Sequence, residues 1–275
     1  MNVALAPAAT PRTSVSVRHA VEELLFFGWK NAVSCLFPVL IFALLAISKV
    51  VHVSHVARYD LLLVLCLAIQ IAMVRFGLES KREALIITIF HALGLMMEMH
   101  KVRLGSWSYP EEAYTKVGGV PLYSGFMYAS VASFMCQATH RFQLRFEGFP
   151  RRSVAFVLAA AIYINFMTNY LLPDVRQMLV ALLVIAFRKA HVSFVAKERA
   201  RRMPLLLSFT LIGAFVWIAE NIGTFLGAWR YPNQEHGWEP VHVSKLVSWA
   251  LLVIVSLVLV HLLRARAEKT AAETG

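Results

Sequence analysis

Long apolar segments recur along the chain and are separated by short polar connections. A helix of about 20 residues, rising 1.5 Å per residue, spans a hydrocarbon core of roughly 30 Å. The segments lack the two-residue alternation of membrane barrel strands. The pattern therefore predicts eight membrane-spanning helices, near residues 33–51, 60–76, 84–103, 121–140, 153–172, 176–194, 204–226 and 244–263.

The two ends of the chain differ from these segments. Residues 1–14 are rich in Ala, Pro and Thr, which predicts a disordered N-terminus. Residues 15–31 place Val17, Val21 and Leu24 on one helical face and charged residues elsewhere, as an amphipathic helix at a membrane interface does. We expect residues 32–264 to form a single membrane domain and 265–275 a cytoplasmic tail.

Composition agrees with this all-α polytopic membrane bundle. Of the 275 residues, 59% are hydrophobic and 16% charged, whereas a soluble protein carries roughly 25% charged residues. The three cysteines all fall within apolar segments. An odd number of scattered cysteines argues against a disulfide framework or a zinc site.

The net charge of +11 follows the predicted topology. Of the 27 Lys and Arg residues, 19 lie on the side of the membrane that holds both termini. The positive-inside rule then places both termini in the cytoplasm. No basic stripe or groove-reading motif accompanies the charge, so a nucleic-acid partner is not expected.

A motif of the form E-x6-G-[S/A]-W-x-Y-P occurs twice, at 98–110 and 220–232. The copies follow the third and seventh predicted helices, so both helices cross in the same direction. This predicts two parallel four-helix repeats, 32–141 and 152–264, related by an axis along the membrane normal. The alternative to duplication is that the two segments converged independently on the same useful turn.

The two glutamates of the motif, Glu98 and Glu220, are the candidate catalytic residues. An ionisable group inside a membrane helix costs roughly 2.5–3.5 kcal/mol and normally faces the bundle interior. Either carboxyl could be an acid or a base, or a structural group paired with Lys101 or an Asn. His91 lies seven residues before Glu98 on the same face, where it could relay a proton or simply be hydrogen-bonded. No metal-ligand spacing is present, and no metal is expected.

Further polar and aromatic residues are candidates for substrate binding. Amides inside a membrane helix need partners, which they find either in a binding site or in a neighbouring helix. Trp and Tyr at the end of a span can line a site or anchor it at the interface. The candidates are Asn165, Asn169, Asn221, Trp107, Tyr109, Trp229 and Tyr231.

The chain resembles a known family in M-E-M-H-K-V-R-L-G-S-W-S-Y-P-E, in G-G-V-P-L-Y-S-G-F-M-Y-A-S and in W-I-A-E-N-I-G-T-F-L-G-A-W-R-Y-P-N-Q. These long motifs are similar to domain-of-unknown-function family 817, bacterial multi-pass membrane proteins. The resemblance covers about residues 20 to 263. It implies a location in the bacterial inner membrane, and it brings no known activity.

The pattern E-x2-G-x3-G-x-W-x-Y, from Glu220 to Tyr231, is also similar to membrane carotenoid hydratases and the related small lycopene cyclases. That likeness implies proton addition to an isoprenoid double bond by carboxylates, without a redox cofactor. The first copy departs from it, with Lys101 where the second copy has Gly223. The acidic cyclase signature is replaced by Leu122 and Tyr123.

These observations lead to three hypotheses. The first is a cofactor-free lyase, hydratase or isomerase that performs acid–base chemistry on an isoprenoid or other lipid. The lipid bilayer surrounds this enzyme. The second is a proton- or cation-coupled transporter of small molecules. The third is a membrane assembly or scaffold subunit.

Overall fold

The computed structural model describes residues 17–274, with side chains described as far as residue 260. The predicted disordered segment 1–14 lies outside the described residues. The helices are α1 (Val17–Ser34), α2 (Leu36–Val50), α3 (Arg58–Arg75), α4 (Lys81–Arg103), α5 (Gly125–Arg141), α6 (Arg152–Thr168), α7 (Arg176–Phe187), α8 (Leu205–Phe225) and α9 (Lys245–Thr274).

Helices occupy all eight predicted segments, with bounds that shift by a few residues. The predicted fourth helix began at 121, but α5 begins at Gly125 because a short hairpin and the 3-10 turn η1 (Leu122–Ser124) precede it. The predicted tail at 265–275 falls in the last part of α9, whose backbone continues as a helix to Thr274.

The sixth predicted helix is wrong over its last turns. It was expected to run to residue 194, whereas α7 ends at Phe187 and the chain continues as strand β4 (His191–Val195). That strand reads His-Val-Ser-Phe-Val, in which three of the five residues are Val or Phe, types that are enriched in strands. The apolar count alone extended the helix too far.

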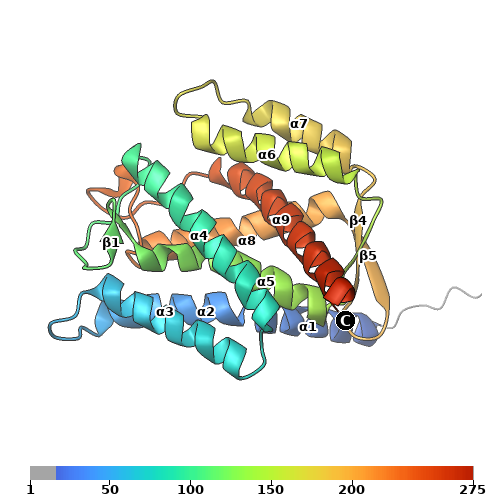
Figure 1. The fold of residues 1–275 in the computed structure, drawn as a ribbon, viewed down its shortest axis with the longest axis horizontal. Coiled ribbons are helices and arrows are strands. Elements are labelled where there is room, and N and C mark those ends of the chain that lie inside the picture. Colours follow the sequence, from blue (N-terminus) through green and yellow to red (C-terminus); the bar gives the residue numbers. More distant parts are fainter. Residues whose placement is uncertain (1–16, 275) are drawn as a thin grey trace, which may run out of the picture.

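Short strands make the fold mostly helical rather than all-α. Strands β1 (Lys116–Val117) and β2 (Val120–Pro121) form an antiparallel hairpin. Gly118 and Gly119 turn it with φ of +59° and +81°, which glycine adopts without steric cost. The strands β3 (Arg145–Glu147), β4 and β5 (Ala200–Pro204) form a second antiparallel sheet in that order. Figure 1 shows β1 and the β4–β5 hairpin at opposite ends of the molecule.

The helices pack as an elongated bundle. In Figure 1, α4 and α9 run diagonally across the front, with the α6–α7 pair on one side and α2 and α3 on the other. A bend of 62° at Cys35 separates α1 from α2. The apolar face of α1 is exposed, as Val17 and Leu24 are 81% and 68% accessible, which agrees with an amphipathic helix that has an external partner.

Several helices have the composition of membrane segments. Within the described part of the chain, α4 and α8 are long and apolar enough to cross a membrane, and the bent α1–α2 pair would add a third crossing as one broken span. The helices α6 and α7 and the Lys245–Val260 part of α9 are apolar but shorter. Large apolar side chains such as Phe215 (72%) and Ile71 (67%) are exposed. Such exposed apolar surface marks contact with a membrane or a partner.

Candidate functional site

Glu98 is buried near the end of α4 and accepts hydrogen bonds from three aromatic side chains. Trp107 Nε1 and the Tyr109 hydroxyl donate to Oε2 at 2.6 and 2.8 Å, and the Tyr128 hydroxyl donates to Oε1 at 2.6 Å. The aromatic turn and α5 together enclose the carboxyl group.

Glu220, buried near the end of α8, has a similar environment. The Tyr231 hydroxyl donates to Oε1, and Trp249 Nε1 of α9 donates to Oε2 at 2.6 Å. Each glutamate is thus held by the tyrosine of its own turn and by an aromatic residue of the following helix.

The donors occupy corresponding places in the two motifs. Tyr109 and Tyr231 each follow their glutamate by 11 residues. Tyr128 and Trp249 follow by 30 and 29 residues, and both lie early in the next helix, α5 and α9 respectively. The sequence repeat therefore corresponds to a repeated pattern of hydrogen bonds.

The two tryptophans of the motif are used differently. Trp107 donates to Glu98, whereas the ring of Trp229 lies against Gly223, where an added Cβ would meet ring carbons at 2.7 Å. The corresponding position of the first motif holds Lys101, whose amine donates to Asn169 Oδ1 at 3.1 Å. The exchange of Gly for Lys explains why only one tryptophan reaches its glutamate.

The two turns meet through their middle residues. The Ser108 amide donates to the Arg230 carbonyl, and the Arg230 amide donates to the Ser108 carbonyl, both at 2.9 Å. The rings of Trp107 and Tyr231 pack edge to face with centroids 6.0 Å apart. Lys245 Nζ lies 4.7 Å from the Tyr231 ring centroid and 5.6 Å from that of Trp107. Both turns thus belong to one cluster.

The carboxyl groups of Glu98 and Glu220 share no hydrogen bond, and each accepts from its own aromatic donors. They form two neighbouring sites with a common aromatic wall rather than a carboxyl pair that shares a proton.

The turn tyrosines remain protonated donors. Burial first, and then the charge of Glu98, raises the pKa of Tyr109 well above its ordinary value. Burial and Glu220 do the same to the pKa of Tyr231. Both phenols therefore donate to the carboxyl groups across the physiological pH range.

Gly94, one turn before Glu98 in α4, allows the Tyr128 ring to approach the helix. A Cβ at this position would lie 2.4 Å from ring carbon Cδ2 of Tyr128. The bond from Tyr128 to Glu98 therefore depends on a glycine at position 94.

His91 does not join the cluster through a hydrogen bond to Glu98. Its ring packs edge to face on Phe126, with centroids 4.5 Å apart, and lies against Gly125. Its Nδ1 atom is buried without a hydrogen-bond partner among the described residues. No hydrogen bond between the described side chains of His91 and Glu98 supports the predicted proton relay.

The three asparagines bind protein groups. Asn165 donates to Asp174 Oδ1 and accepts from the Val175 amide, both at 3.0 Å, which holds the α6–α7 connection. Asn169 accepts from Lys101, and Asn221 accepts from the Val241 amide at 2.9 Å. These contacts fit the alternative in which the amides join segments of the protein together.

Sequence reasoning missed Tyr128, Trp249 and Lys245. The usable signal was an aromatic residue at the fourth or fifth position of the helix that follows each turn, about 30 residues after the glutamate. Among the described residues, no group of three or more His, Cys, Asp or Glu side chains is arranged to hold a metal ion.

An apolar crevice lies beside the two carboxyl groups. Its volume is about 80 Å³, and residues of α4, α5, α6, α8 and α9 line it. Tyr128 and Trp249, the helix donors to Glu98 and Glu220, both form part of its wall. Each carboxyl group is therefore one aromatic side chain away from the crevice.

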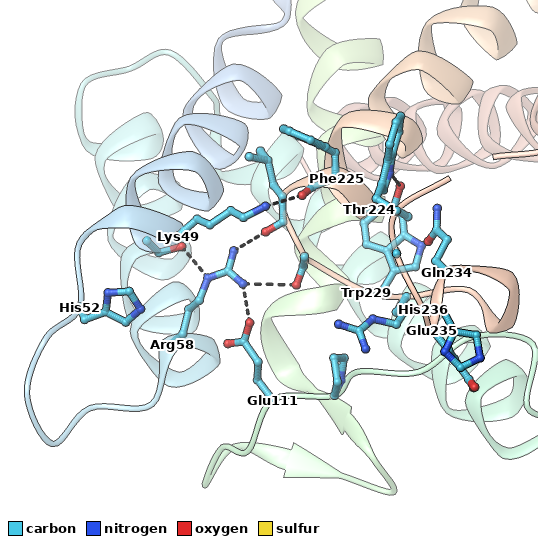
Figure 2. Close-up of a pocket in the computed structure, with 17 residues that line it drawn as sticks. Lys49, His52, Arg58, Glu111, Thr224, Phe225, Trp229, Gln234, Glu235 and His236 are labelled. Carbon is cyan, nitrogen blue, oxygen red and sulfur yellow. Dashed lines mark hydrogen bonds and ion pairs between the residues drawn. The ribbon is translucent and has the colours of Figure 1, made fainter. Parts of the chain in front are cut away.

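A larger polar cavity of about 650 Å³ lies at the turns, between the ends of α2, α3 and α8 (Figure 2). Arg58 lines its wall and donates to Glu111 Oε1 at 2.7 Å, to Ser48 Oγ at 3.0 Å and to the Leu226 carbonyl at 2.8 Å. Lys49 donates to the Phe225 carbonyl at 2.6 Å. These cations bind the carbonyl groups left free at the end of α8.

Comparison with known proteins gives a family. A family described as "Protein of unknown function (DUF817)" matches residues 23–257. The chain is 50% identical over 251 residues to the uncharacterized protein YoaT of Bacillus subtilis strain 168, which covers 91% of this chain and 95% of the relative. No solved structure matches. Because the family model spans most of the chain and the relative is similar over nearly its whole length, this protein belongs to the DUF817 family.

Proposed function

We propose that this protein is a multi-pass protein of the bacterial inner membrane, with both termini in the cytoplasm and helices α2 to α9 arranged as two parallel four-helix halves. The matching hydrogen bonds of Glu98 and Glu220 and the reciprocal bridge between Ser108 and Arg230 support this duplication. A bridge between equivalent residues is the contact that a twofold axis requires.

Within this arrangement, the protein is an acid–base enzyme that acts on an isoprenoid or other lipid. The observation that carries the proposal is the double role of Tyr128 and Trp249. Each donates a hydrogen bond to a buried glutamate and also lines the apolar crevice. A hydrocarbon chain in that crevice would lie beside two buried carboxyl groups.

The chemistry of the two donors assigns different roles to the glutamates. A tyrosine hydroxyl both donates and accepts hydrogen bonds, whereas the Trp indole N–H only donates. Tyr128 can therefore take a proton from protonated Glu98 while its own proton adds to a carbon of a substrate double bond. Glu220, which bonds to Trp249, stays an anion that stabilises the carbocation formed.

The aromatic rings contribute as well. A cation over the face of a Trp or Tyr ring is stabilised by about 0.5–2 kcal/mol. The reaction then ends in one of two ways. Loss of a proton from a neighbouring carbon to the Tyr128–Glu98 pair gives an isomerised double bond, and addition of water gives a hydrated product.

Incorporation of deuterium tests this function. Purified protein in nanodiscs is incubated in D2O with a lipid extract of its own host, and the lipids are analysed by mass spectrometry. Wild-type protein should add carbon-bound deuterium to one lipid class. Tyr128→Phe and Glu98→Gln should lower this exchange by about 100-fold or more, the range for loss of a general acid.

The matched control is Tyr170→Phe, because Tyr170 is 68% exposed and lies away from the crevice. It should exchange at the wild-type rate. Absence of deuterium in every lipid class, together with unchanged lipid and pigment profiles in a deletion strain, would overturn the enzyme proposal.

The polar cavity favours a transporter as the second candidate. A polar volume of about 650 Å³ beside the glutamate turns could admit a small solute, with Glu220 as the coupling group for a proton or cation. Uptake into proteoliposomes that depends on pH and is lost in Glu220→Gln would support it. Without any flux, a reproducible crosslink to one membrane protein would favour the assembly-subunit hypothesis.

A further inference from the structure

The polar cavity at the turns holds charges that the protein itself does not neutralise. Its wall includes the cations Lys49, Arg58 and Arg230 and the carboxyl groups of Glu111 and Glu235. In Figure 2, Glu235 and His236 stand across the cavity from Lys49 and Arg58. The cavity volume of about 650 Å³ lies within the range of sites for small molecules, roughly 300–1,000 Å³.

One set of charges is already bound. Arg58 makes an ion pair with Glu111 at 2.7 Å and also donates to backbone carbonyl groups at the end of α8. Its side chain is only 13% exposed. Lys49 donates to the Phe225 carbonyl and lies 4.8 Å from the centroid of that ring. These groups build the back of the cavity and are fixed in place.

A second set is left free. The side chains of Arg230 and Glu235 make no hydrogen bond or ion pair within residues 17–260, although both line the cavity. They carry opposite charges and do not pair with each other. The imidazoles of His52 and His236 also line the cavity. The free groups thus offer a donor for an anion and an acceptor for a cation.

Two tryptophans complete the wall. Trp229 is held against Gly223, and Trp238 donates from Nε1 to Thr224 Oγ1 at 3.1 Å. Both rings are fixed by these contacts, and both line the cavity. Aromatic faces favour ammonium groups, which adds to the attraction of Glu235 for a cation.

We propose that this cavity binds a phosphoethanolamine-type zwitterion, either as the headgroup of a phospholipid or as a free phosphoethanolamine ester. The phosphate would bind Arg230. The ammonium would bind Glu235 and the tryptophan faces. This site is separate from the apolar crevice and stands whether or not the acid–base function does.

Native mass spectrometry of the full-length protein tests the proposal. The protein is released from nanodiscs that contain equal amounts of phosphatidylethanolamine and phosphatidylglycerol, and the lipids that stay bound are counted. Phosphatidylethanolamine should be retained preferentially. Arg230→Gln should lower retention of both lipids, whereas Glu235→Gln should lower only that of phosphatidylethanolamine, by about fivefold, as expected for one exposed charge contact.

Two exposed residues of the same charges supply the controls: Arg103, the last residue of α4, and Glu112, in the loop that follows. Arg103→Gln and Glu112→Gln should bind both lipids as the wild type does, and unchanged circular dichroism confirms folding of all four variants. Equal retention of the two lipids by the wild type, or a Glu235→Gln variant indistinguishable from Glu112→Gln, overturns the proposal.

Competition separates the two sources of the ligand. Displacement of the bound lipid by free phosphoethanolamine, but not by inorganic phosphate, supports a zwitterion site that also takes a soluble ester. Lipid that resists both competitors supports the lipid-borne source. Equal displacement by inorganic phosphate shows a simple anion site and contradicts the role of Glu235.

Discussion

Ser108 and Arg230 hold the same position in two copies of one turn, and each donates its amide hydrogen to the carbonyl of the other at 2.9 Å. The contact needs no particular side chain, because only backbone groups take part. It fixes the two turns against each other and so fixes the tyrosines that bind Glu98 and Glu220.

Replacement of Glu98 should destabilise the protein more than replacement of Glu220. Glu98 satisfies three buried donors and Glu220 two. A Leu side chain accepts from none of these donors. Glu98→Leu should therefore cost about 1–3 kcal/mol more than Glu220→Leu, because each unsatisfied buried donor costs about 1–3 kcal/mol. Unfolding in detergent measures the difference, and equal losses in both variants would contradict it.

Gly94→Ala should displace Tyr128 and abolish its bond to Glu98. The new methyl group would lie 2.4 Å from the Tyr128 ring, so the ring must move. Overpacking of this kind costs about 1–3 kcal/mol. Gly28→Ala is the matched control, since no atom lies within 4 Å of its added Cβ and Ala favours a helix. The Gly28→Ala control should be as stable as the wild type or more stable. In Gly94→Ala, incorporation of deuterium into lipid should fall as it does in Tyr128→Phe.

Gly223→Ala should change the environment of Trp229 and leave Glu220 bound. The added methyl group would meet the Trp229 ring at 2.7 Å, whereas the donors to Glu220 are Tyr231 and Trp249. We expect a shift in tryptophan fluorescence that disappears when Trp229→Phe is added. Retention of phosphatidylethanolamine should fall as well, because Trp229 lines that cavity. An unchanged spectrum would show that Trp229 does not rest on Gly223.

Acid should loosen the α6–α7 connection through Asp174. Burial acts to raise the pKa of Asp174, but hydrogen bonds from Asn165 and the Arg176 amide, together with the Arg176 charge, lower it overall. A carboxyl group with a lowered pKa in the folded state stabilises that state above its unfolded pKa of about 3.9, and this contribution is lost as the pH falls through the folded value.

Hydrogen exchange of residues 169–176 measures this effect. Protection in the wild type should decrease as the pH drops from about 5 to 3, after correction for intrinsic exchange. Asp174→Asn should start with less protection and lose little more across that range. A pH response of equal size in the variant would assign it to another group.

Chemical labelling tests the proposed topology. With Cys35, Cys66 and Cys136 replaced, a cysteine at Gly237 should react with an impermeant maleimide added to intact cells. A cysteine at Glu198, in the β4–β5 hairpin and 70% exposed, should react only after the membrane is opened. Reaction of both from outside would rule out an arrangement with the hairpin in the cytoplasm.

The sequence was sufficient for the helices and for part of the site. The length of the apolar segments located the helices. The repeated motif singled out Glu98, Glu220 and the two turn tyrosines, and in each copy the tyrosine donates to the glutamate. These features are local, since donor and acceptor are only 11 residues apart and the turn between them repeats.

The remaining site residues depend on packing between helices. Tyr128 and Trp249 reach the glutamates only because α5 packs on α4 and α9 on α8. The amide of Asn165 bonds to Asp174 and Val175 in the α6–α7 connection, whose path the sequence does not specify. Likewise, β4 becomes a strand because β3 and β5 are available as partners on both sides.

The position of Arg58 has a consequence for the order of synthesis. Its guanidinium binds the carbonyl groups of Leu226 and Gly227, which lie 168 and 169 residues later in the chain. While a ribosome makes the chain from the N-terminus, Arg58 can pair with Glu111 and Ser48 of the first half, but its bonds to the end of α8 form only after α8 emerges. Maturation of the protein thus includes a late step in which hydrogen bonds from Arg58 join the second half of the chain to the first half.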